Sequence, residues 1–289
     1  MKKQGLEQAG SHREALEETP VLDLDRYESL KALAFSLSTR FKKKGDLKDL
    51  EEWIQCHREA LELVPAPHPN RYESLNALAL SLIRRFKKTG DFKDLEECIQ
   101  CHREELEMVP ASHRSGSLIC LAYGLSTRFE KTGNFEDLDA SLRGHREALE
   151  SRPPLHPDRN VSLYYLAHVL HVRFSQTGDF EDLEEIIRCY REAVELFPTL
   201  HPSRILSLHN LGAVLSTRFQ EKGNFEDLDE SIRCHREALE LSPAPHPYQF
   251  CWLDTLAKVL STRFQEKGDI EDLDESIRYR QEALELRPT

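Results

Sequence analysis

The chain has 289 residues, and its 39 Lys and Arg against 51 Asp and Glu give a formal net charge of -12. General nucleic-acid binders and proteins that dock on anionic membranes both need basic patches, so this balance argues against both kinds of partner. No apolar run approaches the roughly 18 residues of a membrane-spanning helix, and Met1–Gly10 lacks the apolar stretch of a signal peptide. The seven Cys are therefore interpreted as reduced thiols of a cytoplasmic or nuclear protein.

An internal repeat of about 45 residues runs through the chain. Its clearest mark is a set of six Gly spaced 45, 43, 45, 45 and 45 residues apart, namely Gly45, Gly90, Gly133, Gly178, Gly223 and Gly268. Self-similarity at a fixed period is the signature of a solenoid, in which each unit packs against its neighbours. Before the first full copy, residues 11–20 match the close of a unit, so residues 1–20 are predicted to be a partial repeat that holds a second helix only.

Each full unit is predicted to be a pair of antiparallel α-helices. In the second copy, apolar residues from Leu75 to Phe86 recur at steps of three and four, which is typical of one face of a helix. Gly90 then fits a left-handed helix cap, and a second periodic stretch runs from Phe92 to a stop at Pro110. No segment shows the alternation of a β-strand. In chain order, the six predicted pairs occupy residues 21–66, 67–111, 112–154, 155–199, 200–244 and 245–289.

Three short motifs of the fifth copy resemble those of a known repeat family. They are Leu211-Gly212 in the first helix, the turn that begins at Gly223, and the close from Ala238 to Pro243 (ALELSP). They resemble the tetratricopeptide repeat, which has a Leu-Gly pair, a Gly-Asp-Tyr turn and an Ala-Leu-Glu-Leu-x-Pro close. The resemblance covers nearly the whole chain. It implies an all-α, right-handed superhelical solenoid of antiparallel helix pairs, with units of 45 residues instead of 34.

The amino-acid sequence of the repeat is also similar to that of long tetratricopeptide-like arrays of mushroom-forming fungi. The similarity is carried by Leu-Ser-Thr-Arg-Phe, Glu-Asp-Leu-Asp-Glu and Cys-His-Arg-Glu-Ala-Leu, all present in the fifth copy. Members of that group often carry an NTPase module or a CHAT-type protease beside the repeats, and this chain shows neither. The resemblance therefore leaves open that the chain is the sensor or regulatory arm of a larger signalling protein, as a fragment or a stand-alone relative.

Four positions keep the same residue in every copy. A position that meets the same neighbour throughout a stack is expected in the core, and this applies to Leu30, Leu75, Leu118, Leu163, Leu208 and Leu253, and to Phe41, Phe86, Phe129, Phe174, Phe219 and Phe264. The recurring charged residues are Arg40, Arg85, Arg128, Arg173, Arg218 and Arg263, with Asp49, Asp94, Asp137, Asp182, Asp227 and Asp272. Their regular spacing predicts ion pairs or helix-end contacts, with a charged binding stripe as the alternative.

Two positions of the first helix differ in every copy, and they lie four residues apart on one helix face. The first row is Lys31, Asn76, Ile119, Tyr164, His209 and Asp254. The second row is Phe35, Leu80, Tyr123, His168, Ala213 and Lys258. By the resemblance, both rows match the ligand-lining positions on the concave wall of tetratricopeptide arrays. A variable face on a fixed scaffold is where a repeat protein places recognition, and drift at solvated positions is the alternative.

We therefore expect a peptide or protein partner to contact the concave face. The expected contact residues are Phe35, Leu80, Ile119, Tyr123, Tyr164, His168, His171 and His209. Exposed apolar and aromatic side chains at these positions would be poor choices for idle surface. Their three His add side chains whose charge can change between about pH 5 and 8.

The segment from Cys98 to His102 (CIQCH) fits the attachment pattern of a c-type haem. The fifth copy keeps Cys234-His235 without the first Cys, so the match is interpreted as repeat consensus, and no haem or zinc is expected. The recurrent His of the second helices are interpreted as packed, hydrogen-bonded side chains. His168, His171 and His209 could together bind a transition metal, but no acidic or Cys ligand is obviously paired with them.

No Gly-rich phosphate loop, Ser elbow or Cys-His dyad stands outside the repeat pattern. We therefore predict no catalytic residues, no cofactor and no enzymatic activity, and a scaffold for protein interactions instead. A structural or self-associating rod is the third alternative. Neither end shows the polar capping helix that stable solenoids carry, so end-to-end self-association or a missing continuation is expected around Ile277 and Leu284.

Overall fold

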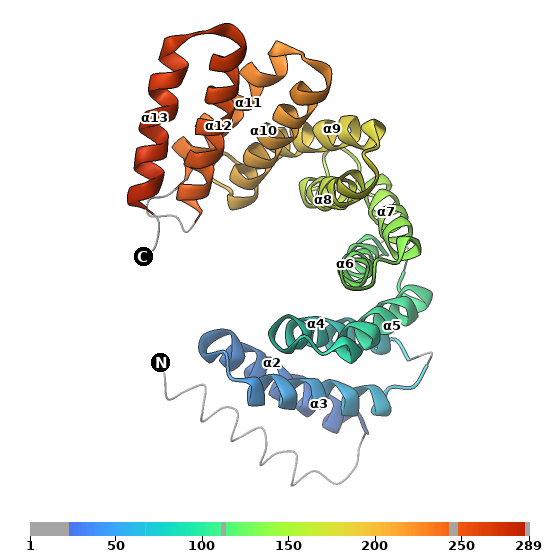
Figure 1. Ribbon diagram of the computed structural model, residues 1–289. Helices are drawn as coiled ribbons and strands as arrows, with labels where there is room; N and C mark the ends of the chain where they lie inside the picture. The colour runs from blue at the N-terminus through green and yellow to red at the C-terminus, as the bar shows by residue number, and fades with distance from the viewer. Residues whose placement is uncertain (1–22, 67, 111–113, 243–247, 287–289) are drawn as a thin grey trace. The chain divides into compact units, whose positions relative to one another are not determined.

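The computed structural model describes residues 23–66, 68–110, 114–242 and 248–286. All regular structure in these ranges is α-helical, and the helices follow one another in pairs (Figure 1). The first three pairs are α2 (Asp23–Lys44) with α3 (Leu47–Leu63), α4 (Arg71–Thr89) with α5 (Phe92–Met108), and α6 (Arg114–Thr132) with α7 (Phe135–Glu150). The other three are α8 (Arg159–Thr177) with α9 (Phe180–Leu196), α10 (Pro202–Lys222) with α11 (Phe225–Leu241), and α12 (Gln249–Lys267) with α13 (Ile270–Glu285).

The chain divides into two compact units, Met1–Ala148 and Leu149–Thr289. Within the first unit, α3 packs against α4 and α5 against α6. Within the second unit, α9 packs against α10 and α11 against α12. The prediction of an all-α protein built from stacked helix pairs is confirmed. The predicted partial repeat at residues 1–20 lies outside the described residues, and no described helix has the length and apolar character needed to cross a membrane.

The turn inside each pair depends on a backbone conformation that Gly adopts at little cost. Gly90 has a φ of 74°, and its N–H donates to the carbonyl of Phe86 at 2.8 Å, which caps the end of α4. The next residue, Asp91, is the N-cap of α5, and its side chain accepts the backbone N–H of Lys93 at 3.1 Å. All six predicted cap Gly have positive φ, so the predicted left-handed caps are confirmed.

The predicted core positions are confirmed for all six recurring Leu, which are buried. Four of the six recurring Phe are buried as well, but Phe174 and Phe264 are half-buried, so the expectation of a buried ring is wrong for these two copies. The ring that covers Phe174 is that of Phe180, with centroids 6.2 Å apart, whereas Phe135 lies 5.3 Å from Phe129. The looser contact leaves more of the Phe174 ring open to solvent.

Small residues let the two helices of a pair approach closely. In the fifth copy, the Ser231 hydroxyl donates to the carbonyl of Gly212 at 2.7 Å, and Ser141 and Ser276 make the equivalent bond to Ala122 and Ala257. A Cβ added to Gly212 would meet the His235 ring at 2.7 Å, closer than side chains tolerate. The Leu-Gly pair of the sequence motif is thus explained by the ring that packs onto its Gly.

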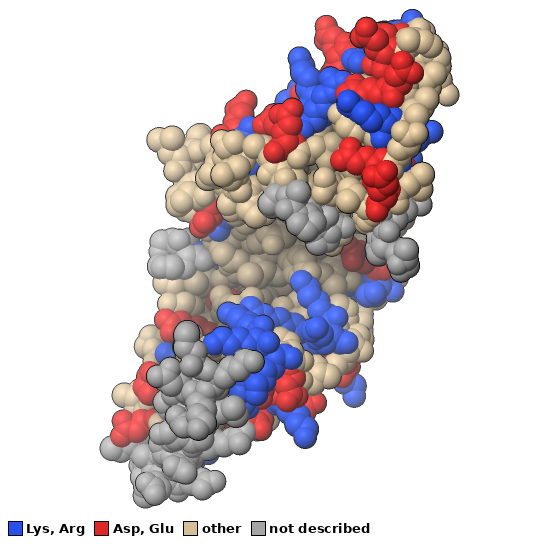
Figure 2. All heavy atoms as spheres, turned by 90° about the vertical axis from the view of Figure 1, so that its left-hand side faces the viewer, with Lys and Arg blue, Asp and Glu red and all other residues tan. Residues whose placement is uncertain are grey.

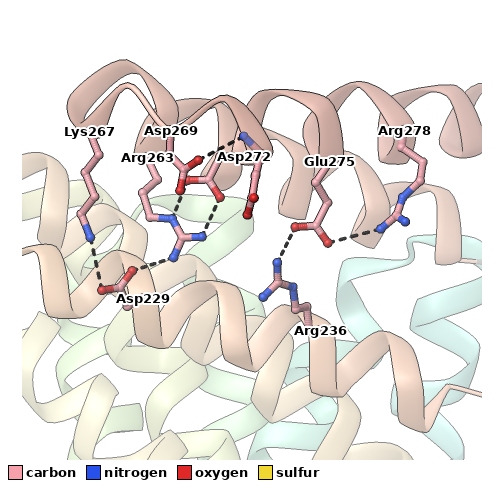
Figure 3. A network of polar contacts seen from close by, with 9 residues as sticks. Asp229, Arg236, Arg263, Lys267, Asp269, Asp272, Glu275 and Arg278 are labelled. Carbon is pink, nitrogen blue, oxygen red and sulfur yellow. Dashed lines mark hydrogen bonds and ion pairs between the residues drawn. The ribbon is translucent and has the colours of Figure 1, made fainter.

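A buried ion pair closes every helix pair. The Arg near the end of each first helix donates two parallel hydrogen bonds to the Asp in the first turn of the second helix, nine residues later. In the sixth copy, Arg263 Nε and Nη2 lie 2.7 and 2.6 Å from the Asp272 carboxylate, and Nη1 reaches Asp229 of the preceding pair at 2.7 Å (Figure 3). The six Asp are buried, and the hydrogen bond to Asp272 raises the pKa of Arg263. The predicted ion pairs are confirmed.

We expect Phe129→Ala to lower the free energy of unfolding by about 3–5 kcal/mol, because it removes a buried ring from a packed layer. Glu130→Ala, at the exposed neighbouring position, should leave stability nearly unchanged. Urea unfolding followed by circular dichroism measures both. Equal losses would place Phe129 outside the core.

Arg85→Leu should cost about 3–5 kcal/mol, because it leaves the buried carboxylate of Asp94 without its guanidinium. The control is Arg58→Leu, which breaks a partly exposed pair with Glu97 and should cost about 0–1 kcal/mol. A further Asp94→Leu change in the Arg85→Leu background should recover part of the loss. If chemical denaturation gives the same stability for Arg85→Leu and Arg58→Leu, the buried pair does not hold the helices together.

Candidate partner-binding face

In the first unit, two of the three residues in the second row of variable positions are exposed. Phe35 of α2 is 72% exposed and Leu80 of α4 is 40% exposed, although both are large apolar side chains. Tyr123 of α6 is half-buried and carries the Lys87 ammonium over its ring, 4.7 Å from the centroid. Such a cation–π contact holds a positive charge beside an aromatic surface. These three residues occupy equivalent positions of successive first helices.

The first row faces inward instead. Ile119 is only 8% exposed, so the expectation that this side chain is exposed is wrong. In the copy before it, the amide of Asn76 donates to the buried carboxylate of Glu105 at 3.1 Å. The Ser117 hydroxyl donates to the same oxygen at 2.8 Å, and the His102 ring nitrogen lies 2.8 Å from the other oxygen. At Asn76 and Ile119, the first row of the predicted face therefore belongs to the packing between helices.

In the second unit, the first row packs against other rings. Tyr164 of α8 is half-buried, with its ring centroid 5.7 Å from Tyr165 and 6.3 Å from Tyr190. Burial raises the pKa of Tyr164, and also that of Tyr190, whose hydroxyl accepts a hydrogen bond from Asn210 at 3.3 Å. These contacts anchor the half-buried Tyr164 ring in the packing of α8 and α9.

The three predicted His differ in their surroundings. His168 and His171 are exposed on α8. Partial desolvation of its ring by the surrounding protein, together with the nearby His168, lowers the pKa of His171. His209 of α10 packs between His235 and Trp252, with ring centroids 5.0 and 5.9 Å away, and this burial lowers its pKa to about 4. The expectation that His209 changes its charge between pH 5 and 8 is therefore wrong, because it stays neutral throughout that range.

The Cys and His of the second helices are packed into the stack. Burial raises the pKa values of Cys98 and Cys101 to about 12, so both are thiols at neutral pH. His57 accepts the indole N–H of Trp53 at 2.8 Å, as expected of a packed, hydrogen-bonded His. The His235 ring nitrogens have no hydrogen-bond partner among the described residues. Among the residues that the structure describes, no group of three or more His, Cys, Asp or Glu is placed to hold a metal ion.

A shallow depression of about 440 Å³ lies between α11, α12 and α13, and no sequence pattern indicated it. Its lining includes Arg236, Glu275 and Tyr279, and Figure 3 shows Arg236 and Glu275 pointing toward one another there. Polar residues on solvated helix faces look alike in a sequence whether or not they line a hollow. The depression lies outside both variable rows.

A family model described as "Tetratricopeptide repeat" matches residues 73–115 and 204–248. Each match covers nearly all of one helix pair, α4 with α5 or α10 with α11, and the cap Gly and the Arg–Asp pair lie inside it. Two of the six helix pairs thus match the tetratricopeptide repeat, and the fold of the chain is tetratricopeptide-like. Such repeats are generally non-catalytic scaffolds for protein interactions. A comparison with curated proteins finds no match.

Solved tetratricopeptide structures share the fold. The C-terminal part of a repeat-containing protein from Cytophaga hutchinsonii gives a TM-score of 0.62 at 10% identity, covering 96% of this chain and 95% of that one. Tetratricopeptide-like repeats of a kinesin light chain-like protein from Podosopora anserina give 0.51 at 17% identity, covering 75% and 98%. YrrB, described as a tetratricopeptide protein with an unusual peptide-binding site, gives 0.50 at 15% identity, covering 80% and 97%.

The stability of this tetratricopeptide-like chain should fall as the pH drops from 6.5 to 4. The pKa of His209 is lowered from 6.5 to about 4 in the folded state, so between these values the unfolded chain binds the additional proton. The shift corresponds to a loss of about 3 kcal/mol over that range.

His209→Asn, which places there the residue found at Asn76, should remove this part of the pH dependence. Thermal melts of both proteins at pH 7.5 and 4.5 measure it. If the stability of the wild type and of the variant fell equally between pH 7.5 and 4.5, the pKa of His209 would not be lowered by folding.

Proposed function

We propose that the chain binds a peptide or protein segment through the variable face of its first helices. The observation that carries the proposal is the exposure of Phe35, at 72%, on a helix whose equivalent neighbours carry the exposed Leu80 and the cation-covered Tyr123. Large apolar side chains are rarely left in water in a row without a partner. Aromatic side chains give much contact area at low entropic cost and dominate interface hot spots.

The eight residues of the face take different parts in this proposal. Phe35, Leu80 and Tyr123 form the apolar contact of the first unit, and His168 and His171 form the exposed polar contact of the second. Ile119 in the first unit, and Tyr164 and His209 in the second, are buried or half-buried, so in this proposal each positions the exposed residues of its own unit.

The peptide-binding site named for YrrB, which has a similar fold, supports a peptide as the partner class. The proposal includes action in the cytoplasm or nucleus. It includes no nucleic acid and no membrane, because the net charge is -12.

Exposed apolar side chains on α13 favour a second interaction. Ile277 and Leu284 are exposed on the last described helix. Two copies that cover these side chains for one another would form an end-to-end contact, which we include in the proposal as self-association. Its area is confined to one helix, so it is expected to be weaker than the binding of a segment along the face.

The test starts from peptides selected from a displayed library with the intact chain. Their affinity for Phe35→Ala/Leu80→Ala/Tyr123→Ala should fall about 30-fold or more, as expected when hot-spot side chains are removed. Ala is already present at the equivalent position, Ala213, so the replacement suits the helix. Calorimetry or fluorescence anisotropy measures the affinity.

The matched control is Leu155→Ala/Leu200→Ala, which removes two apolar side chains that are 97% and 78% exposed and lie outside the face. The affinity of this control variant for the selected peptides should equal that of the wild type. If the peptides bound the folded triple variant as tightly as they bind the wild type, the variable face would not be their binding site.

A further inference from the structure

Seven lysines gather at the turns of the first two helix pairs. They are Lys42, Lys43, Lys44, Lys48, Lys87, Lys88 and Lys93, half of the 14 Lys of the chain, and we call them the lysine edge. All seven are exposed. They lie at the end of α2 and α4 and in the first turn of α3 and α5. Figure 2 shows blue side chains gathered on one face of the lower, N-terminal unit.

The fold does not require Lys at these positions. The position of Lys48 and Lys93 is Glu in all four later copies, namely Glu136, Glu181, Glu226 and Glu271. That position is the second residue of a helix, where the positive end of the helix dipole favours an acidic side chain and disfavours a cation. The position of Lys42 and Lys87 is Gln in the last two copies, at Gln220 and Gln265. Lys at the edge therefore gives up a local stabilisation that the later copies keep.

None of the seven forms an ion pair with another described residue, although lysines of the later turns do. Lys222 lies 2.6 Å from Glu184, and Lys267 lies 3.4 Å from Asp229 (Figure 3). At the lysine edge only Lys87 has a ring contact, with Tyr123.

The acids beside the edge are already engaged. Asp49 and Asp94 bind Arg40 and Arg85, and the N-cap Asp46 accepts the backbone N–H of Lys48 at 3.0 Å. None of these acids pairs with a lysine side chain of the edge.

The lysine edge stands out against an acidic chain. Residues 1–148 hold 23 Lys and Arg against 26 Asp and Glu, whereas residues 149–289 hold 16 against 25. Phosphate recognition favours the planar guanidinium of Arg, which pairs with phosphate through two hydrogen bonds, whereas Lys acts as a point charge on a flexible stem. The exposed cations at these two turns are all Lys, and the net charge of -12 repels a long polyanion such as RNA more strongly than a short one. A short carboxylate-rich segment suits both features.

We propose that the lysine edge binds an acidic segment of a partner protein, that is, a run of Asp and Glu residues lying along the turns of the first two helix pairs. The contact is electrostatic, so it weakens as salt screens the charges. It needs no aromatic or apolar group in the partner, so it can hold even if the function proposed for the variable face fails. Among the described residues, Lys87, which lies over the ring of Tyr123, is the one edge residue that also contacts that face.

The probe is a fluorescein-labelled peptide of ten Glu, titrated with the intact chain at low and at physiological salt and followed by anisotropy. The edge variant is Lys42→Gln/Lys43→Gln/Lys87→Gln/Lys88→Gln, and Gln already occupies these positions at Gln220, Gln265 and Gln176. The control variant is Arg143→Gln/Arg188→Gln/Arg233→Gln/Arg278→Gln. It removes the same four charges from exposed second-helix positions that are Gln55 and Gln100 in the first two copies.

The wild type should bind the peptide with an affinity that falls with salt, the edge variant should bind about tenfold more weakly, and the control should match the wild type. Melting temperatures show that both variants are folded. Equal weakening in both variants would mean that net charge alone acts. No binding to the wild type at low salt would overturn the proposal, as would tighter binding to oligo(U) or to phosphatidylserine vesicles than to the Glu peptide.

Discussion

The buried pair between an Arg and an Asp nine residues later governs the whole architecture. A carboxylate without water needs hydrogen bonds from an opposite charge, and the guanidinium fork supplies two parallel bonds to it through Nε and Nη2. In the second copy, Asp94 is held in this way by Arg85, so α5 must start at a fixed distance and angle from the end of α4. The left-handed Gly90 supplies the reversal between them. Each helix pair therefore closes in the same way.

A framework that repeats so closely leaves the other positions free to differ. One position of three successive first helices is occupied by Phe35, Leu80 and Tyr123, and the backbone is α-helical at all three. The difference between them is thus a difference in surface chemistry and not in fold. The same holds at the turns, where Lys48 and Glu226 occupy one position of equivalent helices. Comparison of copies within the chain separates residues that the fold demands from residues that it merely accommodates.

That comparison also marks the limit of what the sequence could predict. It identified the helix pairs, the cap Gly, the recurring Leu and the Arg–Asp pairs, because each recurs for one physical reason. It failed for Ile119 and His209, which vary although Ile119 is buried and His209 packs against Trp252. Variation shows that no shared neighbour constrains a position, and it does not show exposure. Glu105 is such a case: it is buried where the other copies carry Ala, and Asn76 satisfies it in that copy alone.

The two proposed surfaces would act on different steps of binding. Apolar contacts such as those of Phe35 form only after close approach, and their loss is felt mainly in the dissociation rate. Unpaired lysines act over roughly 10 Å at moderate salt and raise the association rate with an acidic partner. Lys87 belongs to the second set, yet its ammonium rests on the ring of Tyr123, which belongs to the first. A segment that met the edge first would thus arrive beside the aromatic surface already oriented by charge. The sum of both contributions is larger than either when one partner carries both chemistries, because the second contact is then intramolecular.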